Sequence, residues 1–229
     1  MSRKYIYIVL IFIIFILSTY TFSFNYFKLE QVKDVYNSND LKCKYTISNI
    51  KENNDNYEIL VYYPVTENSK LNSDILNQIN SYIEKFKNSL NEEANTLTIK
   101  FNSFEHDIYT SFVFEAEVSN NNAHSDKYIF VSNFNNKENK VMTINDILIN
   151  DNNSLKNISN AIYENIMKND SIKEYIDDKS IKEYLDLNKE KYECFYFTKN
   201  AVVFCFNTGT ILPKSAGVVY ASISYDYIE

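Results

Sequence analysis

The stretch LNSDILNQINSYIEKFKNSLNEEA, residues 71–94, repeats apolar side chains at every third or fourth position. This spacing places them along one side of an α-helix, which then needs a surface to pack on. Asn72 or Ser73 is the expected N-cap. The pattern predicts one long amphipathic helix. Its apolar stripe consists of Leu71, Ile75, Ile79, Ile83, Phe86 and Leu90.

Strand patterns lie on both sides of this helix. Before it, LKCKYTISNI at 41–50 alternates apolar and polar residues, and NYEILVYYPV at 56–65 includes Pro64, which cannot donate to a strand ladder. Alternation with period two is typical of strands that bury one face. Strands therefore surround the helix. The three strands expected after it are TLTIKFNSF at 96–104, IYTSFVFEAEV at 108–118 and KYIFVSNF at 127–134.

The second half begins with helical patterns. SLKNISNAIYENIMKN at 154–169 has an apolar face. SIKEYID at 171–177 returns as SIKEYLD at 180–186. An offset of about nine residues is two and a half helical turns, so one continuous helix would turn the copies to opposite sides. We therefore expect a break near Asp178–Lys179.

The order of these patterns predicts an α+β fold. We expect a largely antiparallel sheet of about seven to eight strands, packed with three to four helices. No linker rich in Gly, Ser or Pro separates two halves of the chain. Residues 41–135 and 136–229 are therefore expected to be two halves of one domain that share the same sheet.

Residues 1–27, MSRKYIYIVLIFIIFILSTYTFSFNYF, predict a membrane anchor. Arg3 and Lys4 precede an uncharged run from Tyr5 to Phe24. Such a run of about 20 residues forms a helix that crosses about 30 Å of hydrocarbon. The two cations favour a cytoplasmic amino terminus, so a polar spacer at 28–40 and the domain after it are expected outside the cell membrane. A cleaved signal peptide is the alternative, although bulky aromatics stand where a small-x-small cleavage site is expected.

Composition and motifs exclude several classes of function. A net charge of −7 and a pI near 5.0 argue against nucleic acid, because phosphate binding needs clusters of Lys and Arg. The two histidines, His106 and His124, form no His-x-x-x-His or His-Glu-x-x-His spacing, and Cys-x-x-Cys is missing from the sequence. The Gly-x-Ser-x-Gly elbow of many serine hydrolases is also missing. We therefore expect no catalytic residue, no metal and no cofactor.

Two of the three cysteines are predicted to face each other. YECFYFTKNAVVFCFN at 192–207 is typical of a hairpin with its turn at Lys199–Asn200, and counting outward puts Cys194 opposite Cys205. Opposed residues have Cα atoms about 4.5–5.5 Å apart, which a disulfide accepts. A cross-strand disulfide and a pair of buried thiols both remain open. Cys43 is left over.

The loop NTGTILPKSAGVV at 207–219 holds both glycines of the chain and one of its two prolines. Glycine permits a positive φ and proline stiffens the backbone. A stiff loop presents a surface at a low ordering cost, which suits recognition. A constrained connection without a ligand is the alternative. The predicted ligand-binding residues of this loop are Gly209, Pro213, Lys214, Ser215 and Gly217.

Three parts of the chain resemble one known family, in the family's order. YYPVTEN at 62–68 with ILNQINSYIEKF at 75–86 is similar to its Tyr-Pro strand and Ile-Asn helix, and 192–228 is similar to its closing hairpin, Pro-x-x-x-Gly loop and last strand. The family is the extracytoplasmic domain shared by the amino-terminal region of PdaC-type peptidoglycan deacetylases and lysozyme-binding anti-sigma-V factors. The central segment, 120–148, matches the family at Ala123, His124, Tyr128, Asn133, Thr143, Asp146 and Leu148.

This resemblance covers 41–228 and implies an outer-surface domain that recognises a ligand, with His124 among its contacts. Two departures touch the implied site, because Asn121 and Asn122 replace paired glycines and Lys214 replaces an aromatic residue. We expect a single-pass, membrane-anchored binding or sensor domain of the cell envelope, whose partner is peptidoglycan glycan or a cationic wall hydrolase such as lysozyme. The alternatives are a cell-wall carbohydrate hydrolase or deacetylase that uses His124 and Asp126, and a structural subunit of an envelope complex.

Overall fold

The computed structural model describes residues 43–90, 95–120, 125–148, 152–185 and 188–228. Residues 42–229 form one compact unit. The predicted anchor and spacer lie outside the described residues. Within the described ranges, no helix combines the length and apolar character that a membrane crossing needs.

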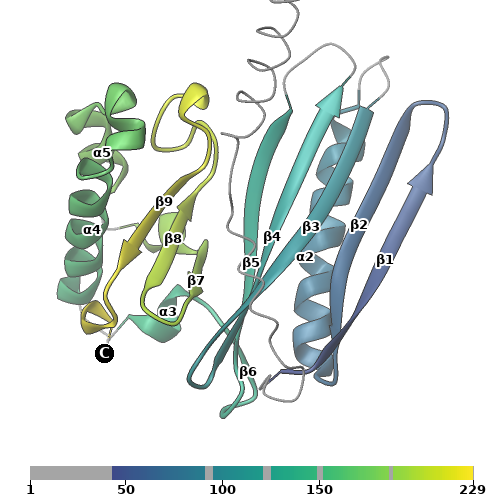
Figure 1. The fold of residues 1–229 in the computed structure, drawn as a ribbon, viewed down its shortest axis with the longest axis horizontal. Helices are drawn as coiled ribbons and strands as arrows, with labels where there is room; N and C mark the ends of the chain where they lie inside the picture. The colour runs from purple at the N-terminus through teal and green to yellow at the C-terminus, as the bar shows by residue number, and fades with distance from the viewer. Residues whose placement is uncertain (1–42, 91–94, 121–124, 149–151, 186–187, 229) are drawn as a thin grey trace, which may run out of the picture. The chain divides into compact units, whose positions relative to one another are not determined.

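The first sheet contains six strands in chain order (Figure 1). Neighbouring strands are antiparallel except β2 and β3, which are parallel. A parallel connection requires a crossover, and α2 (Ser69–Asn88) supplies it. The strands are β1 (Tyr45–Asn53), β2 (Tyr57–Thr66), β3 (Asn95–His106), β4 (Tyr109–Asn120), β5 (Asp126–Asn135) and β6 (Lys140–Met142).

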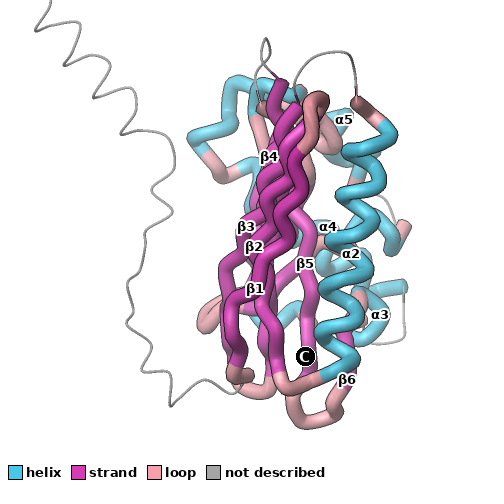
Figure 2. Tube along the Cα trace, turned by 90° about the vertical axis from the view of Figure 1, so that its right-hand side faces the viewer, coloured by secondary structure: helices cyan, strands magenta, loops and turns pink. Residues whose placement is uncertain are grey.

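Helix α2 packs along one face of this sheet (Figures 1 and 2). Its predicted apolar stripe is buried from Leu71 to Phe86, against side chains of β2 to β5. The predicted N-cap was wrong, because Asn68 accepts hydrogen bonds from the backbone N–H groups of Lys70 and Leu71. Asn72 instead bonds the backbone N–H and C=O of Thr66, at 2.8 Å each. Its side chain therefore ties the end of β2 to the first turn of α2.

The last part of the chain forms a second sheet, antiparallel throughout, from β7 (Phe195–Phe197), β8 (Val202–Phe206) and β9 (Val219–Ile223). It lies between the first sheet and α4 (Asn152–Met167), as Figure 1 shows. Its core includes Ile158, Ile162 and Phe204, which are fully buried. The short helices α3 (Ile144–Ile147) and α5 (Asp178–Tyr184) complete this layer.

The prediction of an α+β fold is confirmed, whereas the prediction of one shared sheet was wrong. The described residues hold nine strands and four α-helices, and the strands form two sheets. The last strand expected near the end of 192–228 is β9, which ends at Ile223, and a 3₁₀ turn follows at Tyr225–Tyr227. The physical reason for the second sheet is that the outer edge of β5 is already occupied, partly by β6 and partly by side chains described below.

The repeated SIKEY segments are separated by a break, as predicted, although it lies slightly earlier than expected. The first copy forms a 3₁₀ helix at Asp170–Tyr175, and α5 begins at Asp178. Ile172 and Ile181 occupy the same position in the two copies, and both are buried in the core of the second sheet. The break lets both isoleucines reach one core.

Candidate functional site

The Gly/Pro loop, residues 207–218, connects β8 to β9. Gly209 has φ = +76°, which confirms the positive φ predicted there, and Gly217 also has a positive φ, +72°. Pro213 has φ = −53° and leads into a 3₁₀ turn at Lys214–Ala216. Of these three residues, only proline fixes its own φ, whereas the two glycines supply angles that other residues rarely adopt.

The tip of this loop is exposed, while its base is held inside the protein. Pro213, Lys214 and Ser215 are exposed. The two residues before them, Ile211 and Leu212, are buried in the core of the second sheet. The structure therefore presents a short, stiff tip above an apolar base.

The loop is fixed to the outer edge of β5 by its first two residues. The side chain of Asn207 accepts a hydrogen bond from the Ile129 backbone N–H at 2.6 Å and donates to the Ile129 carbonyl at 3.0 Å. The hydroxyl of Thr208 donates to the Lys127 carbonyl at 3.2 Å. Asn207 thus makes the pair of bonds that a neighbouring strand would make, which protects an otherwise open sheet edge.

Helix α2 protects the same edge of β5 two residues further along the strand, at Val131. Gln78 donates to the Val131 carbonyl at 3.2 Å. Gln78 and Ser132 both donate to one carboxylate oxygen of Asp74, at 2.8 and 2.6 Å. Because these side chains use the backbone groups of β5, strand β7 finds no free ladder there and belongs to a separate sheet.

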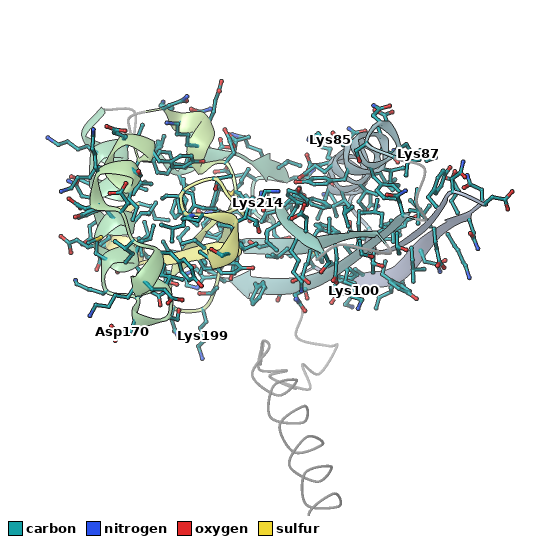
Figure 3. The ribbon with its side chains drawn as sticks, turned by 90° about the horizontal axis from the view of Figure 1, so that it is seen from above. Lys85, Lys87, Lys100, Asp170, Lys199 and Lys214 are labelled. Atoms are coloured by element: carbon teal, nitrogen blue, oxygen red, sulfur yellow. The ribbon has the colours of Figure 1, made fainter. Side chains whose placement is uncertain are left out.

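Lys214 lies across the loop, close to the start of β5 (Figure 3). Its Nζ is 3.7 Å from a carboxylate oxygen of Asp126, and 73% of its side chain is exposed. An exposed pair of this kind contributes little to stability. A Cβ atom at Gly209 would stand 3.0 Å from Cγ of Lys214, so the glycine also makes room for the lysine stem.

Only one of the two histidines lies in the part of the chain that the structure describes. His124 lies outside the described residues. The ring of His106 stacks on Tyr225, with centroids 4.1 Å apart and an interplanar angle of 14°, which is a packing arrangement. Among the side chains that the structure describes, no group of three His, Cys, Asp or Glu residues is placed to hold a metal ion.

Four residues were not predicted from the sequence, two at the base of the loop and two on the first sheet. Asn207 and Thr208 precede Gly209 directly, and a turn-forming Asn-Thr-Gly run was the available signal. Tyr62 and Ile47 are 40% and 67% exposed. Tyr62 alternates with buried Val61, so it lies on the sheet face away from α2. Ile47 pairs with Pro64, which is two residues from Tyr62 on the same strand, so Ile47 and Tyr62 are diagonal neighbours. Strand periodicity alone did not distinguish these two side chains from core residues.

The cysteine hairpin has the predicted register. Phe195 pairs with Phe204, and the Cys205 backbone N–H donates to the Cys194 carbonyl at 2.8 Å. Both cysteines are free thiols in this structure, with Cys205 buried and Cys194 half-buried. Cys43 is buried in the core beneath α2.

Of the two loop glycines, Gly217 gives the clearer test of backbone strain by substitution. Its φ of +72° and ψ of −151° define a region that only glycine populates readily, at a cost of about 1–3 kcal/mol for other residues. No atom within 4 Å would contact an added Cβ, so Gly217→Ala measures backbone strain alone. We expect a loss of about 1–3 kcal/mol in the free energy of unfolding by urea titration. An unchanged midpoint would mean that this loop relaxes to an ordinary conformation.

Comparisons with known proteins support the fold. Residues 145–226, which run from α3 to the end of the second sheet, match the family model described as protein of unknown function (DUF3298). A DUF3298 family protein from Pseudomonas aeruginosa PAO1 has a similar structure, with a TM-score of 0.52, 13% identity, and coverage of 81% of this chain and 91% of that one. A member from Bacteroides fragilis has a TM-score of 0.51, 14% identity, and coverage of 81% and 92%. A search of curated proteins finds no significant match. At these identities the likeness shows the fold alone.

Proposed function

We propose that the chain is a membrane-anchored binding domain of the cell envelope. The ligand is a wall-associated one, either peptidoglycan glycan or a cationic wall hydrolase such as lysozyme. The resemblance to the PdaC and anti-sigma-V extracytoplasmic domain, which spans 41–228, supports the same role. The contact surface is the tip of the Gly/Pro loop.

The stiff, exposed tip at Pro213–Ser215 is the observation that carries this proposal. Pro213 fixes its own φ, and Asn207 holds the base of the loop on β5. A surface that is already ordered loses little conformational entropy when it binds. The net charge of −7 adds long-range attraction for a cationic partner, which salt weakens.

Binding is tested with the purified 229-residue chain, incubated separately with isolated cell wall and with lysozyme. We expect retention of the chain by one of the two. If the retained ligand is the cell wall, Lys214→Ala should weaken that binding by about tenfold, the effect of a moderate hot-spot residue. Retention by neither ligand contradicts the proposed function.

Two control variants locate the binding surface. Lys199→Ala changes another lysine of the second sheet, in the β7–β8 turn and apart from Lys214 (Figure 3). Tyr62→Ala removes an exposed ring from the open face of the first sheet. Both variants should bind like the parent chain. If Tyr62→Ala loses binding and Lys214→Ala keeps it, the sheet face and not the loop is the contact surface.

The location is tested independently of the ligand. The run from Tyr5 to Phe24 predicts that the domain lies outside the membrane. Protease added to intact cells should therefore degrade the part of the chain after residue 28, while a cytoplasmic marker protein survives. Survival of that part in intact cells, with degradation after lysis, would contradict the proposed location.

A further inference from the structure

We propose that Cys194 and Cys205 are a redox-active pair, and that their oxidation to a disulfide locks the base of the Gly/Pro loop onto β5. This modification site is independent of the ligand proposed above. It rests on the register of the hairpin, on the unequal exposure of the two thiols and on the position of Ile129 between the pair and the loop.

The register places the two cysteines directly opposite each other in the hairpin. The Cys205 N–H donates to the Cys194 carbonyl at 2.8 Å, so the residues are a hydrogen-bonded pair of the antiparallel ladder. In such a pair the Cα atoms are about 5.5 Å apart and both side chains lie on one face. A disulfide accepts Cα separations of about 4.4–6.8 Å.

The two thiols differ in access, which sets the order of reaction. Cys194 is half-buried, whereas Cys205 is 3% exposed. Burial is the largest cause that raises the pKa of the Cys205 thiol well above its usual value, and Cys194 adds to it. Since the thiolate is the nucleophile, Cys194 reacts first and Cys205 second.

The oxidant is a disulfide compound, either a small molecule such as oxidised glutathione or a thiol–disulfide oxidoreductase. The Cys194 thiolate attacks one oxidant sulfur, forms a mixed disulfide and releases the first thiol of the oxidant. The Cys205 thiolate then attacks Sγ of Cys194 and displaces the second thiol. The two cysteines lose two electrons and two protons, and the oxidant disulfide gains both as two thiols.

The disulfide would affect the loop because the Cys194 thiol and the loop residue Asn207 both contact Ile129 of β5. Sγ of Cys194 is 3.6 Å from the Ile129 carbonyl. Asn207, two residues after Cys205, bonds the N–H and C=O of the same residue. Ile129, Cys205, Cys194 and Tyr196 share one apolar cluster between the sheets. A covalent link at the end of the hairpin away from its turn reduces separation of the two strands there. We propose that the hydrogen bonds of Asn207 are retained only while these strands stay paired.

The test oxidises the 229-residue chain with oxidised glutathione and compares it with the chain in dithiothreitol. Trypsin cuts after Lys191, Lys199 and Lys214, so it separates the two cysteines into peptides 192–199 and 200–214. We expect these two peptides to be linked after oxidation, with a mass about 2 Da below their sum because two hydrogens leave. The melting temperature should rise by about 5–10 °C, and hydrogen exchange at 207–217 should slow by about tenfold.

Matched variants make the result decisive. Cys194→Ala and Cys205→Ala should each abolish the linked peptide and the change in exchange, and Cys43→Ala should keep both. Free alkylation of all three cysteines after oxidation, or glutathione retained on Cys194 without the link, overturns the redox pair. A linked pair with unchanged exchange at 207–217 overturns the locking of the loop.

Discussion

Asn133→Ala should destabilise the folded unit by about 2–4 kcal/mol, because it breaks the buried polar contact between the two sheets. Asn133 is 3% exposed on β5. Its side-chain amide donates to the Phe195 carbonyl at 2.7 Å and its oxygen accepts from the Ser111 hydroxyl at 2.6 Å. Ser111 in turn accepts from the Phe197 N–H at 3.0 Å. The edge of β7 is thus satisfied by side chains on the face of the first sheet.

Alanine at position 133 would leave the Phe195 carbonyl without this donor and the Ser111 hydroxyl without this acceptor. Each buried polar group that loses its partner costs about 1–3 kcal/mol. Urea unfolding of both proteins measures the difference. Asn102→Ala is the control, because Asn102 is exposed on β3 and its change should stay within about 0.5 kcal/mol. Equal shifts for the two variants would contradict a structural role for the buried contact.

Ile79→Ala should cost about 2–5 kcal/mol, the usual range for emptying a fully buried isoleucine site. Ile79 is 0% exposed at the centre of the α2 stripe. Ile47→Ala is a control with the same chemistry, since Ile47 is 67% exposed on the edge strand β1 and should lose less than about 1 kcal/mol. Urea denaturation reports both changes. A larger loss at Ile47 would mean that β1 is covered in solution, for example by a second copy.

Local patterns predicted much of the fold because their signals lie within a few residues. The α2 stripe repeats at helical spacing, so its burial followed from position alone. The turn at Lys199–Asn200 set the pairing of Cys194 with Cys205, because register in a hairpin depends on the turn. The N-cap prediction failed because several capping residues stand near one another. The structure selects Asn68 and uses Asn72 to hold Thr66.

The separation into two sheets had no comparable local signal. Strands β5 and β7 both show strand periodicity, and nothing in either pattern states whether they pair. Side chains distant in sequence decide it, with Asn207 and Gln78 on the edge of β5 and Asn133 beneath β7. A polar residue in a strand looks the same in sequence whether it meets water or a buried carbonyl.

In the candidate site, too, some features followed from the local sequence and others only from the tertiary structure. The two glycines predicted unusual backbone angles, and both have a positive φ. The contact of the loop with Ile129, and the placing of Asp126 beside Lys214, join residues roughly 80 positions apart and depend on long-range packing. Helices, turns and the glycine conformations of the loop were therefore determined by the sequence itself, since they arise from neighbouring residues. The number of sheets and the place where the loop is held were decided by the tertiary structure, because buried polar groups find their partners only when distant segments meet.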